Sequence, residues 1–110
     1  MRYVLENDTL RVEIDSFGAE LKSVKRKSDD KEYMWYADKK YWGRTSPVLF
    51  PFVGNCRNKE YRYGGKTYAI GQHGFARDME HTMESRQRIP SGFPYIPMRK
   101  RWKSIHSRLF

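Results

Sequence analysis

The chain has 110 residues, of which 38% are hydrophobic and 32% are charged, and its formal net charge is +9. A chain of this length forms one modest domain that hides only about 60 to 70% of its unfolded surface, which argues against a large buried catalytic cleft. The charge is uneven: residues 1–80 hold 15 basic and 12 acidic residues, a balance of +3, whereas residues 81–110 hold 7 basic residues and 1 acidic residue, a balance of +6.

The lone cysteine and the first residues bear on the compartment. Cys56 is the only cysteine, which rules out an internal disulfide and suits a reducing environment. The chain begins without the basic start and the run of about 7 to 15 apolar residues that a secretion signal needs. It also lacks the run of about 20 apolar residues of a membrane-spanning helix. We therefore expect a cytoplasmic protein.

The first residues predict a β-hairpin. Residues 10–15 alternate between apolar and charged side chains, a pattern typical of a half-buried strand. Residues 3–6 are its candidate partner strand. Asn7 and Asp8 lie between the two segments and tolerate the left-handed backbone conformations that tight turns require.

Two further strands are predicted next. Residues 21–25 form the first of them, and the polar run 26–31, rich in Ser and Asp, predicts the turn after it. Residues 32–36 are rich in aromatic side chains, which favour strands, so we expect an aromatic strand there.

A loop and a second hairpin follow. Residues 48–53 are apolar, but Pro51 cannot donate to a central strand ladder, so we expect a buried loop or edge segment beside a cleft. Gly64 and Gly65 separate the aromatic segment 61–63 from residues 67–70, and paired glycines adopt positive φ angles at no steric cost. This is the clearest hairpin in the sequence.

The fold class follows from these elements. No segment sustains helical spacing over three turns, whereas short strands and turns recur, which predicts an all-β sandwich or barrel. Residues 81–110 differ from the rest, because they carry Pro90, Pro94 and Pro97 with neither strand alternation nor a helical stripe. We interpret them as a basic, proline-containing tail that is either disordered or read from a shifted frame.

Two motifs resemble a known family. The spelling LFPFVGNCRN at residues 49–58, followed by QHGFAR at residues 72–77, resembles the aldose 1-epimerase (galactose mutarotase) family, in the branch of LacX-like and hexose-6-phosphate epimerase proteins. The resemblance covers residues 1–80. It implies an incomplete galactose mutarotase-like β-sandwich (a supersandwich), of which these residues form the N-terminal portion.

The resemblance also implies roles for three residues. His73 matches the family histidine that contacts the sugar ring oxygen and is the catalytic candidate, since the histidine pKa of about 6.5 suits proton delivery. Arg57 matches the substrate-binding arginine, whose guanidinium donates several hydrogen bonds to hydroxyls or a phosphate. Arg77 is a second substrate-binding candidate, and surface pairing with Asp78 or Glu80 is the alternative.

The rest of the family's machinery is expected further along the chain. The resemblance implies a second histidine and a glutamate base beyond the equivalent of Glu80, but His81, His106 and Glu84 stand in no matching motif. Two proton-transfer groups contribute roughly a hundredfold or more each. We therefore expect an isomerase-like chain for a hexose or hexose phosphate that is truncated and inactive, with a sugar or sugar phosphate as its partner.

The sequence also permits functions of other classes. The basic run 99–103, which flanks Trp102, favours a small nucleic-acid-binding module as the alternative. An exposed sheet edge would permit self-association. The histidines and Cys56 lack zinc-site spacing, so we expect no metal, and we expect no cofactor and no membrane partner.

Overall fold

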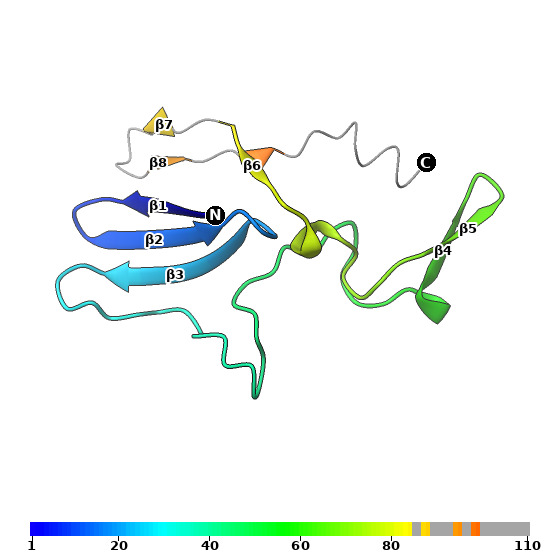
Figure 1. The fold of residues 1–110 in the computed structure, drawn as a ribbon, viewed down its shortest axis with the longest axis horizontal. Helices are drawn as coiled ribbons and strands as arrows, with labels where there is room; N and C mark the ends of the chain where they lie inside the picture. The colour runs from blue at the N-terminus through cyan, green and yellow to red at the C-terminus, as the bar shows by residue number, and fades with distance from the viewer. Residues whose placement is uncertain (85–86, 89–93, 96–97, 100–110) are drawn as a thin grey trace.

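The computed structural model describes residues 1–84, 87–88, 94–95 and 98–99 (Figure 1). Its described part is rich in short strands and has two 3-10 turns as its helical elements, so the all-β prediction is confirmed. The elements are β1 (Arg2–Glu6), β2 (Leu10–Asp15), β3 (Glu20–Arg26), the 3-10 turn η1 (Arg57–Lys59), β4 (Glu60–Tyr63), β5 (Lys66–Ala69), the 3-10 turn η2 (Ala76–Asp78), β6 (Thr82–Met83), β7 (Gln87–Arg88), β8 (Pro94–Tyr95) and β9 (Met98–Arg99).

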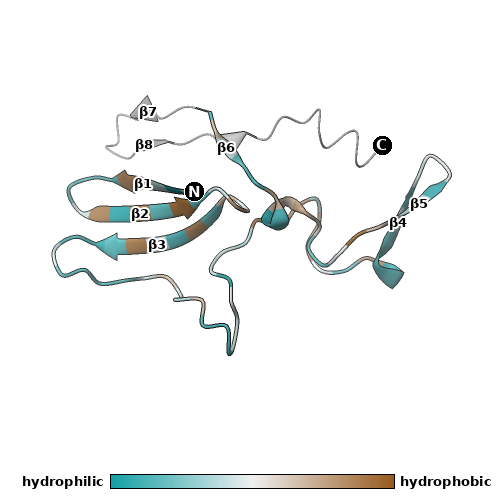
Figure 2. Ribbon diagram, viewed as in Figure 1, coloured by the Kyte–Doolittle hydropathy of each residue, from teal (hydrophilic) through white to brown (hydrophobic). Residues whose placement is uncertain are grey.

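The first three strands form an antiparallel sheet in the order β1-β2-β3. Leu5, Val12 and Val24 face one another across the three strands and share one side of the sheet. The alternation of apolar and polar residues is visible along these strands in Figure 2. The Asn7 side chain closes the first turn, since its Oδ1 accepts from the backbone N–H of Thr9 at 2.9 Å and of Leu10 at 2.7 Å. The opening hairpin and the third strand are confirmed.

The predicted aromatic strand at residues 32–36 is wrong. Only Glu32 pairs there, in one isolated bridge with Lys25. The Glu32 carboxylate accepts from the backbone N–H groups of Val24, Tyr33 and Met34 at 2.9 to 3.0 Å. Because this side chain satisfies the donors of its own neighbours, the segment turns away from the sheet instead of extending along it.

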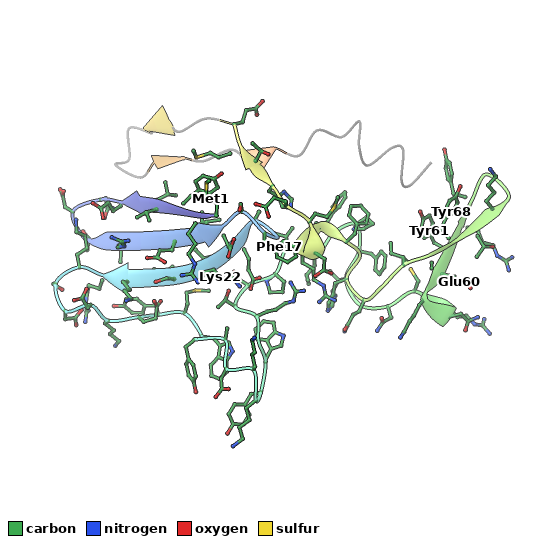
Figure 3. All side chains as sticks on the ribbon, viewed as in Figure 1. Met1, Phe17, Lys22, Glu60, Tyr61 and Tyr68 are labelled. Atoms are coloured by element: carbon green, nitrogen blue, oxygen red, sulfur yellow. The ribbon has the colours of Figure 1, made fainter. Side chains whose placement is uncertain are left out.

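The second hairpin is confirmed and lies apart from the first sheet (Figure 1). β4 and β5 pair antiparallel, with Tyr61 opposite Tyr68. The two tyrosine rings stack with centroids 5.2 Å apart, and Figure 3 shows them side by side. Gly64 and Gly65 have φ angles of 53° and 74°, which explains the pair of glycines at the turn.

The apolar segment 48–53 is a loop, as predicted, but it is not buried. Val53 is 74% exposed, and Val48 and Leu49 are also exposed. The ring of Phe50 packs edge-on against Phe75 with centroids 6.0 Å apart. The loop is held by its backbone and by this ring contact, and not by an apolar core.

Polar residues dominate the buried positions of the described chain. Leu5 and Ala76 are its buried hydrophobic residues, beside the buried polar residues Ser16, Glu20 and Ser23. The radius of gyration is 17.0 Å, whereas a compact domain of this size has about 13 Å. The described elements are therefore more spread out than those of a compact domain, and few of their side chains are buried. The predicted division at residue 80 and the character of the tail stay predictions, because most of residues 85–110 lies outside the described part.

Candidate functional site

The structure joins the loops of the two sequence motifs. The His73 N–H donates to Gly54 O at 2.7 Å, and the Phe75 N–H donates to Phe50 O at 3.0 Å. Gly74 pairs with Phe50 in a parallel bridge and has a φ of 73°. A Cβ on Gly74 would lie 2.2 Å from Phe50 O, so only glycine fits this approach. We call this contact between residues 50–54 and 73–76 the loop junction.

His73 is oriented by the loop junction. The Gly54 N–H donates to His73 Nδ1 at 2.8 Å, and the side chain is half-buried. A neutral imidazole that accepts at one nitrogen carries its proton on the other. The Nε2–H of His73 is therefore a fixed donor. Such a group can hydrogen-bond an ether or hydroxyl oxygen of a ligand.

Arg57 lies on the far side of the same loop. It is the first residue of η1, directly before the β4–β5 hairpin, and it is exposed. Within the residues that the structure describes, its guanidinium has no hydrogen bond or ion pair. The structure thus brings the loop of Arg57 to that of His73, but it does not fix the arginine itself.

Arg77 is half-buried in η2. Its Nε lies 3.6 Å from Asp78 Oδ2, so the surface pairing considered from the sequence is present. The same Nε is buried and finds no hydrogen-bond acceptor in the described part of the chain. Gly18 packs closely against this turn. Its N–H donates to Met79 O at 2.7 Å, and a Cβ on Gly18 would lie 2.5 Å from Arg77 O. The first sheet therefore positions η2.

Glu20 is a buried carboxylate that the sequence analysis did not identify, and it is connected to η2 through Arg44. Glu20 is 2% exposed and accepts from the N–H and the hydroxyl of Thr45 at 2.6 and 2.8 Å, with Lys22 Nζ at 3.0 Å. Burial by itself raises the pKa of Glu20, but the hydrogen bonds from Thr45 and Lys22 outweigh it and lower the pKa to about 2. Glu20 is therefore a permanent anion at neutral pH.

Arg44 links this anion to η2. Its guanidinium pairs with Asp78, donates to Arg77 O at 3.2 Å, and lies 3.9 Å from Glu20 Oε2. No local pattern reveals this network, because Glu20 and Lys22 lie more than twenty residues before Arg44 and Thr45, and Asp78 lies more than thirty residues after them. We call Glu20, Lys22, Arg44, Thr45 and Asp78 the polar network.

Three further expectations from the sequence concern metal binding, membrane-spanning helices and the basic tail. In the described residues, no group of three or more His, Cys, Asp or Glu side chains is arranged to hold a metal ion. No helix there is long and apolar enough to cross a membrane. The side chains of the basic run 99–103 lie outside the described residues.

Comparisons with known proteins agree on one family. The aldose 1-epimerase family model matches residues 1–93, which extends beyond Glu80. The plasmid and chromosomal LacX proteins of Lactococcus lactis subsp. lactis are each 39% identical over 89 residues, covering 76% of this chain and 29% of theirs.

Solved structures give the same result. A galactose mutarotase related enzyme from Lactobacillus acidophilus is 49% identical with a TM-score of 0.76, over 79% of this chain and 29% of that one. A galactose mutarotase-like protein from Lactobacillus casei ATCC 334 is 40% identical with a TM-score of 0.74, over 79% of this chain and 30% of that one. The chain thus spans less than a third of the length of these relatives.

Proposed function

The chain belongs to the aldose 1-epimerase family, and from this premise we propose that it binds a hexose or hexose phosphate at the loop junction without interconverting its anomers. The observation that carries the proposal is the hydrogen bond from the Gly54 N–H to His73 Nδ1. It leaves Nε2–H as a donor of fixed direction. Such a donor suits the ring oxygen of a pyranose.

The two arginines supply the anion-binding part of the proposal. Arg77 is half-buried in η2, the turn that follows His73 and Gly74, and a guanidinium there can donate several hydrogen bonds to an anionic oxygen. Arg57 is exposed and has the bidentate geometry that suits vicinal hydroxyls or a phosphate. We assign both to substrate binding and His73 to the catalytic position.

The carboxylates near the loop junction make poor bases. An efficient general base has a pKa near the working pH. The pKa of Glu20 is about 2, and its oxygens accept hydrogen bonds from Thr45 and Lys22. Asp78 pairs with Arg44. Anomer interconversion needs a base at the anomeric hydroxyl, so binding without turnover is the function that these groups support. We also propose a cytoplasmic location, which Cys56 as the only cysteine supports.

Nuclear magnetic resonance of the full chain tests the proposal. Titration with galactose and with glucose 6-phosphate is expected to shift the amide signals of Gly54 and Gly74, with saturation in the millimolar range. His73→Ala should abolish these shifts. Thr67→Ala is the control, because Thr67 is exposed in β5 and lies outside the loop junction, and its shifts should equal those of the unmodified chain.

Three results would count against the proposal. Absence of any shift with either sugar would refute binding. Equal loss in His73→Ala and Thr67→Ala would refute the assignment of the site to the loop junction. Magnetisation exchange between the anomers that is faster with the chain than in buffer would refute binding without turnover.

A further inference from the structure

The two edges of the first sheet differ. The edge of β3 is covered: the Tyr33 N–H donates to Val24 O at 2.9 Å, and the hydroxyls of Thr45 and Ser46 donate to Leu21 O at 2.6 and 2.9 Å. β1 pairs with β2 on one side only, and none of the described strands pairs with its other side. An unpaired edge of this kind is a template for another strand.

The hydrogen bonds at both ends of β1 show which residues face this open edge. The Ser16 N–H donates to Met1 O at 2.8 Å, and the Asn7 N–H donates to Leu10 O at 3.0 Å. Backbone groups in an antiparallel strand alternate between its two sides. Since residues 1 and 7 face β2, the N–H and C=O groups of Arg2, Val4 and Glu6 face outward.

The side chains at this edge are complementary to themselves. Arg2 and Glu6 are both exposed, carry opposite charges and lie two residues on either side of Val4. An antiparallel pairing centred on Val4 places Arg2 of each copy opposite Glu6 of the other. Opposite charges that face each other across strands stabilise a pair by about 0.2 to 1 kcal/mol, whereas like charges destabilise it.

We propose that β1 is a homodimerisation edge, at which two copies of the chain pair antiparallel about Val4 to form a continuous six-stranded sheet. The pairing is isologous, so each copy uses the same residues and the assembly closes. Tyr3 of one copy then lies beside Leu5 of the other. These residues already share the side of the sheet that carries Val12, so the apolar face becomes continuous across the two copies.

The pairing is expected to be weak and sensitive to salt. Each copy contributes one strand of five residues to the contact. Stable complexes use about 20 to 30 residues and about 800 Å² of surface per partner, so this interface is small. Arg2 also pairs with Glu13 of its own chain at 3.0 Å, but a guanidinium has enough N–H groups to serve two carboxylates. The dimer should therefore form at high protein concentration and dissociate on dilution or in high salt.

Sedimentation velocity of the full chain over a range of concentrations tests this edge. The unmodified chain is expected to show a monomer–dimer equilibrium. Glu6→Arg places like charges opposite each other and should weaken dimerisation at least tenfold, and the double variant Arg2→Glu/Glu6→Arg should regain most of it. Glu60→Arg, which makes the same change at another exposed strand position, in β4, is the matched control and should leave the equilibrium unchanged.

A second variant separates pairing from folding. Val4→Pro removes an N–H that faces outward, a change that edge strands tolerate, so it should abolish dimerisation and leave the circular dichroism spectrum unchanged. A chain that stays monomeric at every concentration overturns the proposal, and so does a dimer that persists in Glu6→Arg or in Val4→Pro. The outcome is independent of sugar binding, because the loop junction contains none of these residues.

Discussion

The loop junction and the β4–β5 hairpin lie next to each other in the chain but are held in different ways. The junction joins Phe50 and Gly54 to residues more than fifteen positions later through backbone hydrogen bonds, and the polar network supports η2 behind it. The hairpin depends on its own turn glycines and on one stacked tyrosine pair (Figure 3). His73 is thus positioned by the tertiary structure, whereas Arg57 is carried on a local element.

This difference has a functional consequence. A donor whose direction is fixed before the ligand arrives costs little entropy on binding, whereas an exposed arginine must be ordered at that moment. The proposed site therefore combines one preorganised group with one adaptable group. Mutations should divide in the same way, with large and global effects at the junction and small and local effects in the hairpin.

The largest effect is expected from Gly74→Ala. A left-handed conformation costs a non-glycine residue about 1 to 2 kcal/mol, and overpacking adds about 1 to 3 kcal/mol. The added Cβ would meet Phe50 O at 2.2 Å. We expect a loss of about 2 to 5 kcal/mol in the free energy of unfolding, measured by urea denaturation.

Gly71→Ala is the control for this prediction. A Cβ at Gly71 would have no atom within 4 Å in the described structure, and its φ is not in the left-handed region. The substitution should be neutral or stabilise the chain by up to about 1 kcal/mol, because alanine restricts the unfolded chain. Equal effects of the two substitutions would show that the loops do not meet at Gly74.

The next largest effect is the loss of unfolding free energy that we expect when acid protonates Glu20 in the polar network. The pKa of Glu20 in the folded chain is about 2, below its ordinary value of 4.5. A group whose pKa falls on folding stabilises the fold above the unfolded value and loses that contribution as the pH drops through the folded value. The unfolding free energy should therefore fall between pH 4.5 and 2.

Replacing the carboxylate tests whether Glu20 causes this slope. Glu20→Gln should lower stability at pH 7 by about 2 kcal/mol, because Thr45, Lys22 and Arg44 lose the charge of their acceptor and hydrogen bonds to a charged group contribute about 1.5 to 3 kcal/mol, and it should flatten the dependence on pH. Glu60→Gln changes an exposed carboxyl in the hairpin and should stay within about 0.5 kcal/mol of the unmodified chain. An unchanged acid slope in Glu20→Gln would exclude Glu20 as its source.

The contrast between the two regions also explains what the sequence could predict. Both hairpins were predictable because their causes are local: alternation in residues 10–15 and the turn residues Asn7, Gly64 and Gly65. The aromatic content of residues 32–36 favours a strand, but the structure has a loop after Glu32 because the Glu32 carboxylate hydrogen-bonds the backbone of its own neighbours. Strand propensity does not take account of this competition between side-chain and strand hydrogen bonds for the backbone N–H groups.

The candidate site was predictable only in part for the same reason. The motif spelling singles out His73 and Arg57, and it shows the glycine that the close approach requires. It does not show that Glu20 meets Thr45, because a partner twenty-five residues away leaves no periodic signal. The polar network, which contacts the turn of Arg77 through Arg44 and Asp78, is therefore visible only in three dimensions.

The smallest effect is expected from Tyr68→Ala. Its ring stacks on Tyr61 at 5.2 Å across the hairpin, and such a pair contributes about 0.5 to 1.5 kcal/mol. Because the pair belongs to the hairpin alone, the loss should appear as faster amide hydrogen exchange in β4 and β5, with no change at Gly54 or Gly74.

The pattern of exchange decides whether the two regions are independent. If the hairpin is a separate cooperative unit, Tyr68→Ala and Gly74→Ala should have additive effects on stability, as distant sites do. The bond from the Ile70 N–H to Lys59 O is the last one inside the hairpin before the chain enters the second motif. Faster exchange beyond it, at His73 or Gly74, would mean that the hairpin supports the junction, and Arg57 and His73 would then act as one unit and not as two.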